Sequence, residues 1–193
     1  MIKYGCQQIS EADIMALTDV LRSEYLTQGP AVQTFEGELN KHCKSKFAVA
    51  VNSATSALHI AYLALELGPG DYLWTSPNTF VSTANAALMC GAKLDFVDID
   101  PKTYNMCAEN LEAKLKKAAE AGKLPKIVVP VHFAGTPCDM KRIKSLSEKY
   151  FFKIVEDASH AIGATYSADN NFASDNPVGS GTYSDLTVFS FHP

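Results

Sequence analysis

Apolar runs of strand length alternate with segments of helical period along this chain, and this alternation constrains the fold more than any other feature. The expected strands lie at residues 47–51, 72–75, 94–99, 127–131, 152–156 and 185–193. The expected helices lie at residues 11–23, 32–43, 55–67, 81–89, 109–121 and 139–150. Strands that are apolar on both faces and alternate with helices predict an α/β fold with a mostly parallel sheet covered by helices.

Length and charge exclude several classes of protein. A chain of 193 residues fits one large domain. The formal net charge of −4 and the lack of a Lys/Arg run argue against a nucleic-acid partner. No apolar run approaches the ~20 residues needed to span a bilayer, and the N-terminus has no apolar signal core, so we expect a cytoplasmic protein with no membrane partner. The five cysteines are widely spaced, which predicts neither a disulfide framework nor a metal site.

The last run of the chain, residues 185–193, has the pattern of a strand that enters a site. An exposed apolar strand end with no helix behind it favours aggregation. We therefore expect the 193 residues to be the front part of a longer enzyme.

Three groups of residues are expected at the carboxyl ends of the strands, where ligands gather in an open parallel sheet. The first group, residues 52–57, joins an expected strand to an expected helix and is rich in small and hydroxyl residues. Free N–H groups and the positive dipole at a helix start suit a phosphate. A plain Ser/Thr helix cap explains the same pattern. The G-x-x-x-x-G-K-[ST] pattern of a P-loop is missing.

The second group is Glu156 and Asp157, at the end of an apolar strand. A carboxylate there is costly to keep charged unless a cation meets it, and one good partner is the protonated ring nitrogen of a pyridine cofactor. An Asp that caps the following turn is the plainer alternative. His160 with His132 could instead form part of a metal site, although no ligand-spacing motif supports it.

The third group is Thr79 and Phe80, in a loop before a helix, and Ser190 is a further candidate on the final strand. An aromatic ring can stack on a flat cofactor, although aromatic residues more often fill a core. Ser190 could donate to a phosphate or simply lie in the sheet. Together the three groups describe a phosphate pocket, an anion and a stacking ring, in the order expected for pyridoxal phosphate.

These stretches resemble the DegT/DnrJ/EryC1/StrS family of sugar-nucleotide aminotransferases, which have the aspartate aminotransferase fold. The similarity is carried by residues 27–30, 52–59, 76–86, 156–164 and 189–193. It implies a helical segment at residues 1–45 that lines the active site and a pyridoxal-phosphate-binding large domain at 46–193, incomplete at its C-terminal end. The C-terminal small domain of the family would be absent from the chain.

The resemblance also implies roles for single residues. Asp157 would pair with the ring nitrogen, Phe80 would stack on the ring, and His160 would lie near its phenolic oxygen. The phosphate would be held by Ala54, Thr55, Ser56 and Ser190. In the family the Schiff-base lysine follows the Ser-Phe-His-Pro run by two residues, so it is expected two residues after Pro193, and no catalytic residue is expected within this chain.

Within the family, the Asp-Ala-Ser-His-Ala sequence and the N-terminal region look most like a branch that aminates a UDP-linked 4-keto-6-deoxy N-acetylhexosamine, in pseudaminic acid or related surface-glycan biosynthesis. The residues implied to bind this substrate are Tyr4, Glu24, Tyr25, Leu26 and Thr27. Glutamate is the expected amino donor, and a homodimer with shared active sites is the expected assembly. A dehydratase or a non-catalytic sensor of the same fold is the main alternative. A nucleotide-binding oxidoreductase module is less consistent, because no G-x-G-x-x-G follows the first expected strand.

Overall fold

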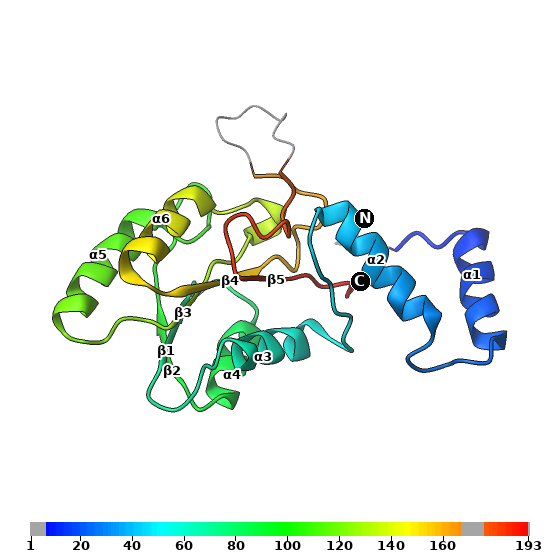
Figure 1. Ribbon diagram of the computed structural model, residues 1–193. Helices are drawn as coiled ribbons and strands as arrows, with labels where there is room; N and C mark the ends of the chain where they lie inside the picture. Colours follow the sequence, from blue (N-terminus) through cyan, green and yellow to red (C-terminus); the bar gives the residue numbers. More distant parts are fainter. Residues whose placement is uncertain (1–6, 167–175, 193) are drawn as a thin grey trace.

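The computed structural model describes residues 7–166 and 176–192 (Figure 1). The helices are α1 (Glu11–Arg22), α2 (Pro30–Cys43), α3 (Ala54–Ala64), α4 (Val81–Met89), α5 (Ala108–Glu120) and α6 (Met140–Tyr150), with a short 3-10 turn, η1 (Phe133–Gly135). The strands are β1 (Tyr72–Thr75), β2 (Lys93–Phe96), β3 (Ile127–Val129), β4 (Lys153–Asp157) and β5 (Leu186–Val188).

The described strands form one sheet in the order β2-β1-β3-β4-β5, and every pairing is parallel. This confirms the predicted α/β fold with a parallel sheet. Because all strands run the same way, their carboxyl ends lie along one edge. At that edge Asp157 of β4 stands in register with Val188 of β5.

Helices cover both faces of the sheet, so the domain has three layers (Figure 1). On one face, α5 and α6 pack against the sheet through a buried core that includes Leu111, Ile143 and Ile154. On the other face, α3 and α4 pack through a second core that includes Tyr62 and Val155. Alternate residues of β4 therefore contribute to opposite cores, as expected for a strand buried on both sides.

Local sequence signals explain where several helices begin. Ser10 starts α1 with a capping box in which its side chain accepts the Asp13 N–H and the Asp13 carboxylate accepts the Ser10 N–H. Asp139 caps α6 by accepting the N–H of Arg142. The α1 helix lies away from the sheet, and none of its residues is buried (Figure 1).

The strand predicted at residues 47–51 is wrong for this structure. The segment has no sheet partner among the described residues, and the side chains of Phe47 and Val49 are both 78% exposed. Its apolar alternation has the period of a strand, but a strand also needs a neighbour to accept its backbone hydrogen bonds. The remaining predicted elements are present, with ends shifted by a few residues.

Within the described ranges, none of the helices has both the length and the apolar character needed to cross a membrane.

Candidate functional site

Asp157 ends β4 at the carboxyl edge of the sheet and is 4% exposed. Its Oδ2 accepts a hydrogen bond from the Thr83 hydroxyl at 2.6 Å. Its Oδ1 accepts from the backbone N–H of Ser159 at 3.2 Å and from the Ser159 hydroxyl at 2.7 Å. The bonds from Ser159 are those of an Asp that caps the following turn, so the plainer sequence interpretation also holds. These donors orient the carboxylate but bring no positive charge.

Two further hydroxyl groups support the Thr83 side chain that reaches Asp157. The Thr83 hydroxyl has one proton, and since the carboxylate takes it, Thr79 donates to Thr83 across 2.8 Å. The Tyr62 hydroxyl donates to the Thr83 carbonyl oxygen at 3.1 Å. Burial, with a smaller contribution from the charge of Asp157, raises the pKa of Tyr62 well above its usual value, so this donor stays protonated.

The predicted phosphate group lies at the start of α3. Ala54, Thr55 and Ser56 form its first turn, and the Ser53 side chain caps the helix by accepting the Ser56 N–H at 3.2 Å. The cap alternative is therefore also correct, through Ser53. The first N–H groups of a helix have no carbonyl partner within it, so this end can still receive an anion. The Thr55 and Ser82 hydroxyls lie 2.7 Å apart, which places the start of α3 beside the start of α4.

Phe80 is the residue that caps α4, and its side chain is 75% exposed. It is not a core residue, which removes the plainer explanation for an aromatic at this position. Thr83, one turn further along α4, contacts Asp157. The start of α4 therefore brings an exposed ring, the Thr55 contact and the buried carboxylate into one region of the molecule.

His160 and Ser190 follow the ends of β4 and β5. The His160 side chain is exposed, and its backbone carbonyl packs so closely on Gly135 that a Cβ there would lie 2.8 Å from the oxygen. Ser190 is half-buried and accepts a hydrogen bond from the His192 N–H at 3.3 Å. The Ala158 N–H donates to the Val188 carbonyl at 2.8 Å, which fixes the two strand ends side by side.

The residues predicted to bind the sugar nucleotide are not brought into this region by any described contact. Glu24, Tyr25, Leu26 and Thr27 are exposed in the connection between α1 and α2. Tyr4 lies outside the described residues. Their roles, and the division of the chain at residue 45, stay predictions.

Asp157 forms no ion pair with any described lysine, arginine or histidine. A carboxylate that is this well buried is stabilised by a cation, and among the described residues only the Thr83 hydroxyl donates to its Oδ2. A planar cationic ring with an attached phosphate matches the carboxylate, the exposed Phe80 ring and the start of α3. The residues present therefore fit pyridoxal phosphate.

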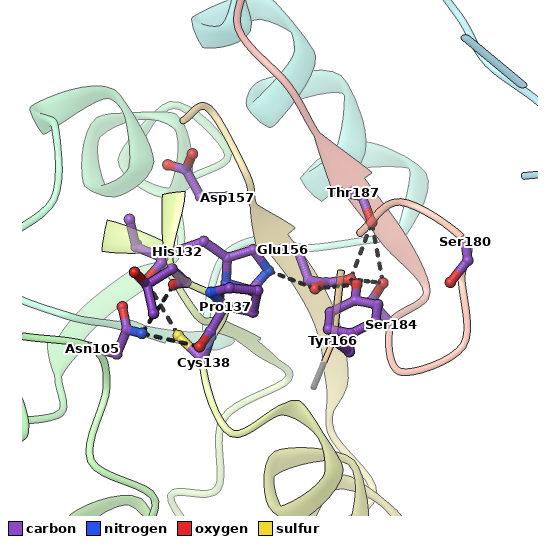
Figure 2. A network of polar contacts seen from close by, with 12 residues as sticks. Asn105, His132, Pro137, Cys138, Glu156, Asp157, Tyr166, Ser180, Ser184 and Thr187 are labelled. Carbon is purple, nitrogen blue, oxygen red and sulfur yellow. Dashed lines mark hydrogen bonds and ion pairs between the residues drawn. The ribbon is translucent and has the colours of Figure 1, made fainter. Parts of the chain in front are cut away.

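Sequence reasoning named Glu156 only together with Asp157 and missed the separate polar network around it (Figure 2). The signal was available, because the period of two in a strand turns Glu156 and Asp157 to opposite faces of the sheet. His132 belongs to this network and is fully buried against Glu156, so it is committed to a hydrogen bond rather than to a metal. The described residues hold no group of three or more side chains placed to bind a metal ion.

Comparison with known proteins agrees with this geometry. The sequence pattern of the DegT/DnrJ/EryC1/StrS aminotransferase family matches residues 7–193. A UDP-4-amino-4,6-dideoxy-N-acetyl-beta-L-altrosamine transaminase of Campylobacter jejuni is 43% identical over 193 residues, which are 100% of this chain and 48% of the relative. The spore coat polysaccharide biosynthesis protein SpsC of Bacillus subtilis is 40% identical over 99% of this chain and 45% of its own length.

Solved structures give the same result. PseC of Helicobacter pylori, an aminotransferase involved in the biosynthesis of pseudoaminic acid, has a TM-score of 0.86 and 30% identity, covering 98% of this chain and 47% of its own. The PLP form of Spr1654 from Streptococcus pneumoniae, described as a sugar aminotransferase, has a TM-score of 0.85 and 32% identity over 99% of this chain and 49% of its own. The chain spans about half the length of the curated relatives it matches.

The fold and the site thus define a large domain of the aspartate aminotransferase type. Within that class, the chain belongs to the DegT/DnrJ/EryC1/StrS aminotransferase family.

Proposed function

We propose that the protein carrying this chain is a pyridoxal-phosphate-dependent aminotransferase that converts a UDP-linked 4-keto-6-deoxy N-acetylhexosamine to the 4-amino sugar. The observation that carries this proposal is Asp157, a buried carboxylate at the end of β4 with no cation among the described side chains, which Thr83 contacts one turn after the exposed Phe80. The identities with the altrosamine transaminase and the likeness to PseC support the choice of substrate and a role in pseudaminic acid or related surface-glycan biosynthesis.

When bound, pyridoxal phosphate supplies an electron sink, provided that its ring nitrogen is protonated. Asp157 holds that proton in place, while Thr83 and Ser159 keep its carboxylate oriented. The first N–H groups of α3, with the Thr55 and Ser56 hydroxyls, bind the phosphate. Phe80 covers one face of the ring and excludes water from it.

Two predicted contacts complete the cofactor site. His160 lies near the phenolic oxygen of the ring, and Ser190 donates to the phosphate from the end of β5. Both follow strands whose ends are hydrogen-bonded to each other, which supports placing them on one ligand. The lysine that attaches the cofactor and moves the substrate proton is expected two residues after Pro193.

The proposal also includes the amino donor and the residues that contact the sugar nucleotide. Glutamate is the amino donor, and Tyr4, Glu24, Tyr25, Leu26 and Thr27 contact the sugar nucleotide.

The protein works as a homodimer in the cytoplasm. The α1 helix supports a dimer, because Ile14, Leu17 and Leu21 form one exposed apolar face that suits a partner surface. A full-length protein that sediments as a monomer would contradict this part.

The test uses the full-length protein and its Asp157→Asn variant. The wild type should bind pyridoxal phosphate and develop a visible absorption band, which borohydride removes as it fixes the cofactor covalently to the protein. It should also aminate the UDP-keto-sugar, as followed by mass spectrometry. Asp157→Asn should still bind the phosphate but lose nearly all transamination, because an amide does not stabilise the ring proton. Asp98→Asn, which changes an exposed carboxylate, is the matched control.

Two outcomes would contradict the proposal. A wild-type protein that takes up no pyridoxal phosphate would refute the aminotransferase function. A dehydrated sugar without nitrogen as the product would favour a dehydratase instead. Full activity in Asp157→Asn would refute only the role given to this residue.

A further inference from the structure

Glu156 is a fully buried carboxylate that the proposed reaction does not use. It precedes Asp157 on β4, and the alternation of a strand turns its side chain to the face covered by α5 and α6. Figure 2 shows Asp157 pointing away from the network that surrounds Glu156. Burying a charged carboxylate costs free energy unless hydrogen-bond partners compensate it, so the partners of Glu156 indicate its role.

Among the described residues, four side chains donate hydrogen bonds to the Glu156 carboxylate (Figure 2). Oε2 accepts from the His132 Nε2 at 2.7 Å and from the Tyr166 hydroxyl at 2.6 Å. Oε1 accepts from the Ser184 hydroxyl at 2.5 Å and the Thr187 hydroxyl at 3.1 Å. Burial by itself raises the pKa of Glu156, but the bonds from His132, Ser184 and Tyr166 outweigh it, and the pKa is lowered. The carboxylate is therefore ionised and acts only as an acceptor.

His132 connects this carboxylate to the backbone of Asp157. The His132 ring Nδ1 accepts the Cys138 N–H at 3.3 Å, so the other ring nitrogen carries the proton that is donated to Glu156. The His132 backbone N–H donates to the Asp157 carbonyl at 3.0 Å. His132, in the segment after β3, is thus hydrogen-bonded to two adjacent residues of β4, to Glu156 through its side chain and to Asp157 through its backbone.

The same segment also fixes the position of His160. Gly135, three residues after His132, has φ of 85° and lies against the His160 carbonyl oxygen. Asn105 holds this segment from its other side, because its amide donates to the Thr136 and Pro137 carbonyls and its Oδ1 accepts the Phe133 N–H. A shift of His132 would therefore be transmitted to the backbone of His160.

Ser184 and Thr187 connect the carboxylate to β5 on the other side. Thr187 is the central residue of β5, in register with Glu156 itself. The chain reaches Ser190 three residues later, with the Val188 carbonyl fixed by the Ala158 N–H. The Glu156 carboxylate thus joins β4 to β5 and to the segment after β3. These three segments position Asp157, Ser190 and His160, respectively.

We propose that Glu156 is a positioning residue, whose carboxylate sets from behind the sheet the relative placement of Asp157, His160 and Ser190 and thereby the affinity for pyridoxal phosphate. This inference rests on the proposed function, because it assigns a purpose to residues around that cofactor. Glu156 itself does not touch the cofactor, since its side chain lies on the opposite face of the sheet.

The experiment measures the dissociation constant of pyridoxal phosphate with full-length wild type and two variants, well below their melting temperatures. Glu156→Gln keeps the size of the side chain but places an amide among four donors. Thr187→Val removes one donor and keeps the shape. The matched control is Ser147→Ala, which deletes a buried hydroxyl that donates to Phe152 O on the same side of the sheet, outside the network.

We expect Glu156→Gln to weaken cofactor binding by about 10-fold or more, the effect seen when outer partners of metal-ligating side chains are removed. Thr187→Val should weaken it in the same direction by a smaller factor. Ser147→Ala should lower the melting temperature without changing the dissociation constant. If Glu156 had a merely structural role, Glu156→Gln and Thr187→Val would behave like Ser147→Ala, with a lower melting temperature and an unchanged dissociation constant.

Cofactor binding within twofold of wild type in both network variants would overturn the inference while leaving the proposed function intact. If Glu156→Gln fails to fold, Thr187→Val alone decides the question. A wild-type protein that binds no pyridoxal phosphate would instead overturn the proposed function, and this inference with it.

Discussion

Replacing Thr83 by valine tests whether the hydroxyl chain at Asp157 stabilises the protein as the structure implies. Thr83 is fully buried, and its hydroxyl donates to the Asp157 carboxylate at 2.6 Å while accepting from Thr79. Valine has nearly the same shape, so no cavity forms and the loss is one of hydrogen bonding alone. The carboxylate keeps its two donors from Ser159, so it loses a donor on one oxygen only.

The magnitude follows from the type of bond. A hydrogen bond to a charged group contributes about 1.5–3 kcal/mol, and a buried group left without its partner adds to the cost. We expect Thr83→Val to lower the free energy of unfolding of the full-length protein by about 2–3 kcal/mol. The measurement is urea denaturation followed by circular dichroism, with the dependence on urea concentration unchanged.

Thr34→Val is the control for this substitution. The Thr34 hydroxyl donates to the Pro30 carbonyl at an exposed position of α2, so its loss should change the free energy of unfolding by less than about 0.5 kcal/mol. If Thr83→Val were as neutral as this control, the hydroxyl would not be bonded to the Asp157 side chain, and the description of the site would be wrong.

Three further results are expected. Gly135→Ala should lower the free energy of unfolding by about 1–3 kcal/mol through backbone strain. In urea denaturation this loss should exceed that of Gly122→Ala, because both glycines have positive φ but, of the two, only Gly135 has a close neighbour, the His160 oxygen. Equal losses would refute the close contact. The Cys138 thiol should react with a thiol reagent at pH 8 only on unfolding, since burial raises its pKa to about 12; rapid labelling in the native state would contradict this. The pKa of Glu156 is lower in the folded chain than its usual 4.5, so its contribution to stability is present above pH 4.5 and is lost as the pH falls below that value. Glu156→Gln should therefore lose less stability than wild type on acidification. If the urea midpoints of the two proteins changed in parallel with pH, the lowered pKa would be refuted.

The sequence predicted the parallel sheet and its covering helices because their signals are local. Strands that are apolar on both faces and helices with one apolar face reflect burial directly. The segment at residues 47–51 has an equally clear pattern but no sheet partner, because pairing depends on a neighbour that no local pattern encodes. Element ends were less accurate for the same reason, as with the helix expected to reach residue 67 that ends at Ala64.

The candidate site divides in a similar way. Asp157 and the start of α3 follow from the rule that ligands gather at the carboxyl ends of parallel strands. Thr83 and Tyr166 could not be found, because each reaches its carboxylate across a large separation in the chain or through a loop that carries no regular pattern. His132 was noticed only as a possible metal ligand, although its actual partner is the adjacent buried Glu156.

The network at Glu156 also constrains the order in which the domain can form. Two of its donors, Ser184 and Thr187, follow Glu156 by 28 and 31 residues, while His132 precedes it by 24. During synthesis from the N-terminus, β4 emerges with a carboxylate whose donors are incomplete, and burying it at that stage is unfavourable. Within the described sheet, β4 therefore gains the full stability of this network only when β5 docks beside it.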